Sequence, residues 1–358
     1  MLIVRSPVRI SFAGGGTDLP AYYQRFGGAV LSTTINKYFY TILCKRGDAR
    51  VQVISSDLRV FETWSNMATM DVRGSGLEIP LAVLREFACD ISVDLFLSSE
   101  IPPGTGLGSS ASVCVNILKT VSTYLNQPLS KYELAERAFH IARNVLGRQV
   151  GRQDEFAAAF GGLNFITFGA DGVTHVQPVD LDPDLRRELQ SNLMLFFTGS
   201  AHHSWTILQE QEKSAANHSG PAVEALHEVR SLADRMLAEL RSGNLHSFGT
   251  LLDEGWQAKK RISGKISNSR IDHLYDLAHR AGALGGKITG AGGGGFLLLY
   301  CESECQKAVR SALHDEGIQE MAFSFDTNGA QVIVNDPFID GDERAGSRWI
   351  FTPAASAS

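Results

Sequence analysis

The length, composition and charge of the chain exclude several classes of protein. Its 358 residues are long for one hydrophobic core, which predicts two domains. Hydrophobic residues make up 44% and charged residues 20%, as in ordinary soluble proteins. A formal net charge of −6 argues against nucleic-acid binding, which needs a basic face. No apolar run approaches the roughly 20 residues that span a bilayer, and no secretory leader is recognisable, so we expect no membrane partner. With five cysteines and no CxxC spacing, reduced thiols in a cytoplasmic protein are the simplest expectation.

The first predicted strand leads into a glycine loop. Leu2 to Phe12 alternates like a strand and is followed by three glycines, Thr17 and Asp18. Consecutive glycines let a backbone approach a ligand closely, and Thr17 and Asp18 would then present a hydroxyl and a carboxylate to it. Alternatively, Asp18 is the N-cap of a helix that begins with Leu19 and Pro20.

Strand-like segments dominate the next part of the chain. Residues 27–36, 38–45 and 50–54 are rich in β-branched and aromatic side chains, and we predict three short strands separated by Asn-Lys and Gly-Asp turns. Residues 79–89 show helical spacing of large apolar side chains, which indicates a helix that packs against the core.

The stretch from Ile101 to Ser112 has the strongest functional pattern. It lies between a predicted strand at residues 93–97 and a predicted helix with apolar residues four apart, from Val113 to Leu125. A glycine-rich approach to free helix amides makes a phosphate site. No lysine follows the glycines, and the spacing differs from the dinucleotide fingerprint, so backbone amides and hydroxyls would bind the phosphate. The simpler alternative is an ordinary turn with Ser109 as N-cap.

A second carboxylate stands out after the next helix. Residues 130–146 are predicted to be helical, and Ser130 and Glu133 fit a capping box. Asp154 follows, framed by glycines on both sides. It either takes part in catalysis as a base or anchor, or caps a helix over residues 155–160. Strands at 163–168 and 173–176 and a polar segment at 180–190 come next.

The C-terminal half combines helices with a second glycine loop. Helices are predicted at residues 221–242, 245–261, 271–282 and 305–316, and strands at 193–197, 296–300 and 331–334. Lys259 and Lys260 form a basic cluster that either complements a helix dipole or binds a phosphate. Four consecutive glycines, 292–295, precede the buried strand. Residues 337–358 are predicted to be a weakly structured tail.

Three of these segments together resemble the GHMP kinases, the superfamily of galactokinase, homoserine kinase and mevalonate kinase. They are residues 7–18, 103–111 and 287–295, in the order that the family uses. Strands and helices mix in both halves, so the predicted fold class is α+β. The resemblance implies a ribosomal-S5-like ATP-binding domain at residues 1–185 and a ferredoxin-like domain at residues 186–336, with the site between them.

The resemblance also implies roles for individual residues, with ATP and Mg²⁺ as cofactors. Asp154 and Arg9 would act in catalysis. The phosphates of ATP would be bound by Pro103, Gly104, Gly106, Leu107, Gly108, Ser109, Ser110, Ser112, Gly292 and Gly293, and Ser110 would also contact Mg²⁺. The sugar would be bound by Gly15, Gly16, Thr17 and Asp18, and its distal phosphate by Lys259 and Lys260.

One position departs from the family pattern. Sugar-kinase relatives have a glutamate about twelve residues before the catalytic aspartate, and it helps to bind Mg²⁺. This chain has Ala142 there. Because Mg²⁺ takes few protein ligands, Ser110, the triphosphate and waters could suffice, or the metal could bind weakly.

Within the superfamily, residues 5–18 and 151–155 most resemble the D-glycero-D-manno-heptose 7-phosphate kinases, which phosphorylate the anomeric C1 hydroxyl. We therefore expect a phosphorylated sugar as substrate, with a homodimer possible. Another sugar 1-kinase, similar to galactokinase or fucokinase, is the nearest alternative. A catalytically silent sugar or nucleotide sensor is a second, and a decarboxylase of the mevalonate branch is a weaker third.

Overall fold

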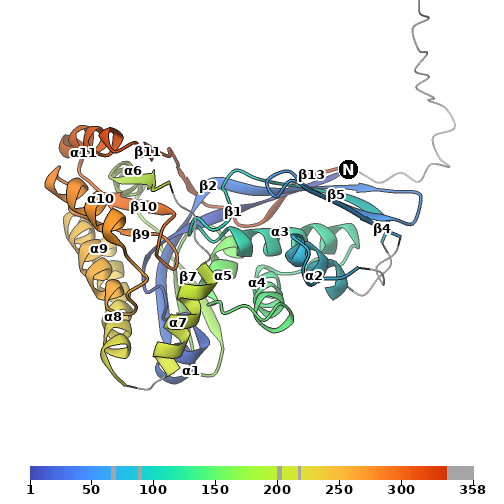
Figure 1. Cartoon of the computed structure of the whole chain (residues 1–358), viewed down its shortest axis with the longest axis horizontal. Coiled ribbons are helices and arrows are strands. Elements are labelled where there is room, and N and C mark those ends of the chain that lie inside the picture. Colours follow the sequence, from blue (N-terminus) through green and yellow to red (C-terminus); the bar gives the residue numbers. More distant parts are fainter. Residues whose placement is uncertain (66–69, 88–90, 200–203, 217–218, 337–358) are drawn as a thin grey trace, which may run out of the picture.

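The computed structural model describes residues 1–65, 70–87, 91–199, 204–216 and 219–336, so the predicted tail 337–358 lies outside the described residues. Two sheets with helices packed against them form an α+β fold, as predicted (Figure 1). None of the helices in these ranges is long and apolar enough to cross a membrane.

The larger sheet contains strands from both ends of the chain. Its path is β13-β1-β2-β5-β3-β4, with β6, β7 and β12 joined to it through β2. All its pairs are antiparallel except β3 with β5. Its strands are β1 (Leu2–Ala13), β2 (Gly28–Lys45), β3 (Val51–Ser55), β4 (Val60–Trp64), β5 (Val93–Ser99), β6 (Leu163–Phe168), β7 (Thr174–Pro178), β12 (Phe325–Asp326) and β13 (Gln331–Asn335).

The prediction of a turn at Asn36-Lys37 was wrong. Residues 28–45 form one continuous strand, β2, which pairs with β1 along its length. The partner of Pro7 is Tyr38 and the partner of Val8 is Ile35, so Asn36 and Lys37 lie in a bulge. A bulge adds residues to one strand without ending the ladder, and the local sequence resembles that of a turn.

Helices α2 (Glu78–Glu86), α3 (Ser109–Tyr124), α4 (Lys131–His140) and α5 (Gln153–Phe160) lie on one face of this sheet (Figure 1). Buried Asn116 of α3 donates to the Ser6 hydroxyl at 3.2 Å and to the Phe39 carbonyl at 3.0 Å, which fixes the helix on β1 and β2. The predicted capping box of Ser130 and Glu133 is confirmed at the start of α4. A π-helical turn, η2 (Ile141–Val145), continues α4.

The smaller sheet has the order β11-β8-β10-β9 and is antiparallel throughout. Its strands are β8 (Leu193–Phe197), β9 (Gly285–Ile288), β10 (Phe296–Tyr300) and β11 (Gln319–Glu320). The remaining helices are α1 (Pro20–Phe26), α6 (Pro183–Ser191), α7 (Ser204–Ala216), α8 (Pro221–Ser242), α9 (Leu245–Lys260), α10 (Ser269–Arg280) and α11 (Ser303–Asp315). Every residue of β10 is buried, which explains its uninterrupted apolar sequence.

The chain returns to the larger sheet after the smaller one is complete. β12 pairs with β2 and β13 pairs with β1, although both lie within the second predicted domain, 186–336. The predicted boundary between residues 185 and 186 falls inside α6. The C-terminal part of the chain is therefore connected to the N-terminal part by strand pairing within the larger sheet.

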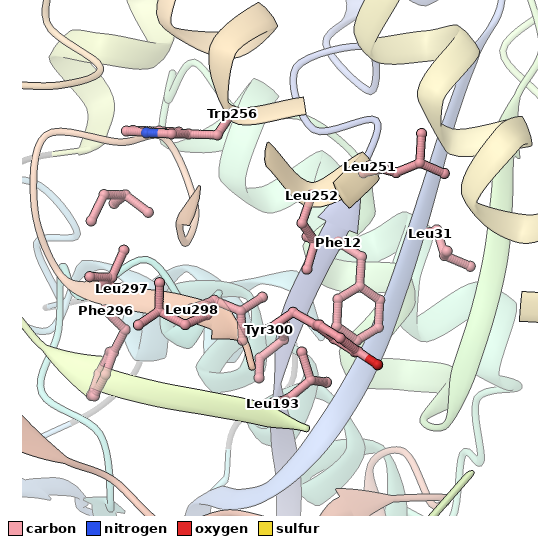
Figure 2. Packing of buried hydrophobic residues seen from close by; sticks show 14 of the residues in the cluster. Phe12, Leu31, Leu193, Leu251, Leu252, Trp256, Phe296, Leu297, Leu298 and Tyr300 are labelled. Carbon is pink, nitrogen blue, oxygen red and sulfur yellow. The ribbon is translucent and has the colours of Figure 1, made fainter. Parts of the chain in front are cut away.

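Aromatic side chains join β1 to the helices of the C-terminal half. Phe12, at the end of β1, packs edge-on against Phe248 of α9 with ring centroids 5.3 Å apart, and Phe248 contacts Tyr300 of β10 at 5.9 Å. Figure 2 shows Phe12 and Tyr300 beside Leu251 and Leu252 of α9. This cluster fixes the end of β1, and hence the first glycine loop, against the second half of the chain.

We predict that Phe12→Ala lowers the free energy of unfolding by about 3–5 kcal/mol, because it removes a fully enclosed ring and leaves a cavity. Urea titration followed by circular dichroism measures this. Phe61→Ala is the matched control, since the Phe61 side chain on β4 is 63% exposed and its loss should change stability by less than about 0.5 kcal/mol. Equal effects of the two variants would contradict this account of the core.

Candidate active site

An ion pair lies at the centre of the site. Arg9 of β1 donates from Nε to Asp154 Oδ1 and from Nη2 to Oδ2, both at 2.8 Å, and from Nη1 to the Gly106 carbonyl at 2.5 Å. The side chain of Arg9 is 5% exposed and that of Asp154 28%. The two-point contact fixes the carboxylate in one orientation beside the central glycine loop.

Helix α5 presents Asp154 in its first turn rather than at its cap. The helix begins at Gln153, and its N-cap is Arg152, whose side chain makes no capping hydrogen bond. The alternative that Asp154 is an N-cap is therefore wrong. The pair with Arg9 accounts for its position instead.

The two later glycine loops pack backbone against backbone. A Cβ atom on Gly290 would lie 2.6 Å from the Cα of Gly106, and one on Gly295 would lie 2.3 Å from the Thr105 carbonyl oxygen. The Thr289 hydroxyl also donates to that carbonyl at 3.3 Å. Side chains at these glycines would force the loops apart, so the glycines serve close contact between two segments almost 200 residues apart in sequence.

The start of α3 faces the same space. Its N-cap is Gly108 in a left-handed conformation, with φ of 76°, so Ser109 is the first helical residue and not a cap. The amides of Ser109, Ser110 and Ala111 precede the first intrahelical bond, which Ser112 makes to the Gly108 carbonyl. A helix terminus with free amides and two serine hydroxyls is of the kind that can bind an anion.

Asp18 is buried beside the ion pair. Its Oδ1 accepts from the Gly16 amide at 2.9 Å and from Gln153 Nε2 at 3.2 Å, and its Oδ2 accepts from the Gln153 amide at 3.3 Å. Leu19 is the N-cap of α1, so the capping alternative for Asp18 is wrong too. Burial, and then the charge of Asp154, raise the pKa of the Asp18 carboxyl above its ordinary value.

A third carboxyl, that of Glu155, is 3% exposed. Its Oε2 has no hydrogen-bond partner among the described residues. Burial, and then the charge of Asp154, raise the pKa of Glu155 well above its ordinary value. An isolated buried carboxyl is costly, so its presence in the site calls for a functional explanation.

Two buried lysines bring positive charge to the same space. Lys259, at the end of α9, donates to the Gly290 carbonyl, and Lys287 of β9 donates to the Phe12 carbonyl at 3.2 Å. Burial, and then the charge of Arg9, lower the pKa of Lys259 to about 8. Burial, and then the charge of Lys259, lower the pKa of Lys287 well below its ordinary value.

These groups line one cavity that is open to solvent. It lies among all three glycine loops, α5, α7 and α9. Of the residues proposed from sequence, the cavity is lined by Arg9, Gly15, Gly16, Asp18, Gly104, Gly106, Gly108, Ser109, Ser110, Asp154 and Lys259. The central loop, the first loop and α5 thus meet as the sequence suggested.

Several proposed residues do not reach the cavity. The Lys260 ammonium nitrogen lies 3.7 Å from Asp272 Oδ1 and over the Trp256 ring. The Gly293 amide donates to the Ile266 carbonyl. Gly292 packs against Ile266 as well. The hydroxyls of Thr17 and Ser112 donate to backbone carbonyls, Leu107 is buried in the core, and Pro103 lines a neighbouring groove. Seven proposed residues therefore do not line this cavity: Thr17, Pro103, Leu107, Ser112, Lys260, Gly292 and Gly293.

Sequence reasoning missed other residues of the lining, among them Ser11, Gly151, Gln153, Glu155, Gln211, Lys287, Gly290 and Ala291. Two of them carry a signal that was readable. Lys287 is the one charged residue of the short strand β9. Glu155 stands directly before the apolar residues 156–160 of α5. Charged side chains are rarely buried unless they are paired, so one in a buried segment is a candidate for a functional role.

A second groove opens beside the cavity and is mainly apolar. Ile79, Leu97, Ile101, Pro103 and Val113 contribute its apolar wall. Ser109 and Ser110 line both spaces. The start of α3 therefore lies between an apolar groove and a charged cavity.

No three His, Cys, Asp or Glu residues within the described ranges gather into a cluster that would hold a metal by protein ligands alone. Mg²⁺ does not need one, because it keeps waters and shares the oxygens of bound phosphates. The exposed Ser110 hydroxyl, next to free helix amides and inside a cavity with carboxylates, provides the kind of oxygen ligand that Mg²⁺ accepts. The residues present fit a phosphate-bound Mg²⁺.

Comparison with known proteins agrees with this geometry. The family models for the GHMP kinases N terminal domain and the GHMP kinases C terminal match residues 78–162 and 236–319. The chain is 31% identical to D-glycero-alpha-D-manno-heptose 7-phosphate kinase of Campylobacter jejuni, over 91% of its own length and 97% of that protein's. It is 27% identical to L-fucokinase/L-fucose-1-P guanylyltransferase of Bacteroides fragilis, over 86% of its own length and 35% of that protein's.

Among solved structures, a D-glycero-D-manno-heptose 1-phosphate kinase from Bacteroides thetaiotaomicron matches with a TM-score of 0.79 and 28% identity, covering 94% of this chain and 100% of that one. The chain belongs to the GHMP kinases. It is a sugar kinase of this family, an ATP-dependent phosphotransferase. The resemblance, the fold and the enzyme class inferred from the three motifs are confirmed.

We predict that Gly151→Ala destabilises the site, because its Cβ would lie 1.9 Å from Asp18 Oδ2. Such overpacking should cost about 1–3 kcal/mol of unfolding free energy. Gly264→Ala is the control, since a Cβ there meets nothing within 4 Å. In an Asp18→Ala background the cost of Gly151→Ala should shrink, and a double-mutant cycle by urea titration measures this; an unchanged cost would contradict the predicted clash.

Proposed function

We propose that the protein transfers the γ-phosphoryl group of ATP to the C1 hydroxyl of D-glycero-D-manno-heptose 7-phosphate. The observation that carries the proposal is the Arg9–Asp154 pair, which lies where the anion-binding start of α3 meets buried Asp18 in one cavity. The relative from Campylobacter jejuni is named for this heptose 7-phosphate, which supports the choice of sugar.

ATP fits along the two connected spaces. The base would lie in the apolar groove between Ile79, Leu97 and Val113, and the phosphates would pass Ser109 and Ser110 into the charged cavity. Amides at the start of α3 would bind the phosphate oxygens. Mg²⁺, held in part by Ser110, would neutralise the phosphate charge.

Asp154 would position the acceptor hydroxyl and stabilise the charge that develops during transfer. Both of its oxygens accept from Arg9, so the carboxylate is held in place. Phosphoryl transfer depends mainly on alignment and charge stabilisation, which suits an anchored carboxylate. Asp18, fixed by Gly16 and Gln153, would hold sugar hydroxyls on the opposite side of the cavity.

We predict ADP release with heptose 7-phosphate, and a loss of turnover of about 100- to 10,000-fold in Asp154→Asn. The measurement is a coupled assay with Mg²⁺-ATP and a panel that contains free heptose, its 1- and 7-phosphates, L-fucose and galactose. Turnover confined to L-fucose or galactose would overturn the substrate in favour of another sugar 1-kinase. Turnover of heptose 1-phosphate alone would overturn the position of transfer.

The phosphate of the sugar would be held by Lys259 together with Lys287, in place of Lys260. Both are buried and line the cavity, whereas Lys260 lies outside it. A charge-assisted hydrogen bond contributes about 1.5–3 kcal/mol. We predict that Lys259→Met raises KM for heptose 7-phosphate by roughly 10- to 100-fold and leaves KM for free heptose little changed. An equal fall of kcat for both sugars would contradict the assignment.

The pH dependence should follow the same lysine. Burial and the charge of Arg9 lower the pKa of Lys259 to about 8, so the ammonium ion is present below pH 8 and is lost above it. We predict that kcat/KM for heptose 7-phosphate falls as the pH rises through about 8 relative to that for free heptose. Parallel profiles for the two sugars would show that Lys259 does not hold the sugar phosphate.

A further inference from the structure

Glu155 is the one carboxyl of the cavity that the proposed mechanism leaves without a task. It lines the cavity next to Asp154 and is 3% exposed. Asp154 is paired with Arg9, and Asp18 is held by Gly16 and Gln153, whereas Glu155 Oε2 has no partner among the described residues. An unpaired buried carboxyl destabilises a fold, so the presence of Glu155 at this position needs a functional reason.

Glu155 lines the same cavity as Ser109, Ser110 and Ala111 at the start of α3. Burial, and after it the charge of Glu155, raise the pKa of the Cys114 thiol. Cys114 follows Ser110 by four residues on the same helix, and residues four apart lie on one face. Glu155 thus lies near α3 and lines the same cavity as Ser110.

The helical turn η2, which comes before α5 in the chain, contains no acidic residue. In η2, residues 141–145 read Ile-Ala-Arg-Asn-Val, so Ala142 stands where the resemblance to sugar kinases implies a metal-binding glutamate. Only Glu155 remains in the cavity as an uncommitted carboxyl, among the residues that the structure describes.

We propose that Glu155 is the carboxylate ligand of the nucleotide-bound Mg²⁺, acting with Ser110 and replacing the acid that is missing at position 142. A hydroxyl, one carboxylate, phosphate oxygens and waters make up the oxygen ligand set that Mg²⁺ prefers. The cation would supply the partner that Oε2 lacks. This assignment rests on the proposed binding of ATP but not on which sugar is phosphorylated.

The test measures metal binding directly, without turnover. Wild type, Glu155→Gln and Asp154→Asn are each titrated with Mn²⁺ in the presence of the non-hydrolysable ATP analogue AMP-PNP, and free Mn²⁺ is followed by electron paramagnetic resonance. Glu155→Gln keeps the shape of the side chain and removes its charge. We expect the Kd of Mn²⁺ to rise by about tenfold or more in Glu155→Gln, the scale on which changes at a metal site lower affinity.

Asp154→Asn is the matched control from the same helical turn. Its Kd for Mn²⁺ should equal that of wild type, because Asp154 is committed to Arg9, although turnover is lost. AMP-PNP binding in EDTA should be the same in all three proteins. An unchanged Mn²⁺ affinity in Glu155→Gln, with AMP-PNP still bound, would overturn the role of Glu155 as a metal ligand. The proposed ATP site would be unaffected by that result.

Two further outcomes remain decisive. If wild type does not bind AMP-PNP at all, the proposed ATP site fails and this inference fails with it. If thermal melting shows that Glu155→Gln does not fold, Glu155→Asp replaces it, since that variant keeps the charge but withdraws it by one methylene group. Weaker Mn²⁺ binding in Glu155→Asp is then expected, and wild-type affinity would overturn the proposal.

Discussion

The rest of the site depends on the bidentate contact between Arg9 and Asp154. It joins β1, near the start of the chain, to α5, and its third hydrogen bond reaches the Gly106 carbonyl of the central loop. A buried arginine is tolerated only when it is paired, so the pair and the loop stabilise one another. Because Arg9 is nearly fully buried, the orientation of Asp154 is set before any ligand arrives.

Glycine makes this arrangement possible through close contact more than through flexibility. The second and third glycine loops touch at backbone distance, and Gly151 leaves just enough room for the Asp18 carboxylate. Chain segments from the beginning, middle and end of the sequence can thus line one cavity. Aromatic packing of Phe12 against Phe248 holds the end of β1, and with it the first glycine loop, against α9.

The balance of charge in the cavity also follows from burial. Three basic side chains, those of Arg9, Lys259 and Lys287, line the cavity together with the carboxyls of Asp18, Asp154 and Glu155, and all of them except Asp154 are buried. Burial raises the pKa of the Asp18 and Glu155 carboxyls and lowers that of the two lysines, so each of these groups gains from an oppositely charged ligand. A phosphorylated substrate and a metal-bound nucleotide would bring such charges.

The sequence by itself determined the family, and it singled out the central glycine loop, Asp18 and Asp154, which line one cavity, because short-range patterns of glycine, serine and acid indicate which segments approach a ligand. The amphipathic helices and the capping box of Ser130 were equally readable, since their signals lie within a few residues. Only the tertiary structure decided the bulge at Asn36, the return of β12 and β13 to the larger sheet, and the separation of Lys259 from Lys260. Adjacent residues on a helix point about 100° apart, so which lysine enters the cavity depends on how α9 packs against β9, and no local pattern encodes that contact.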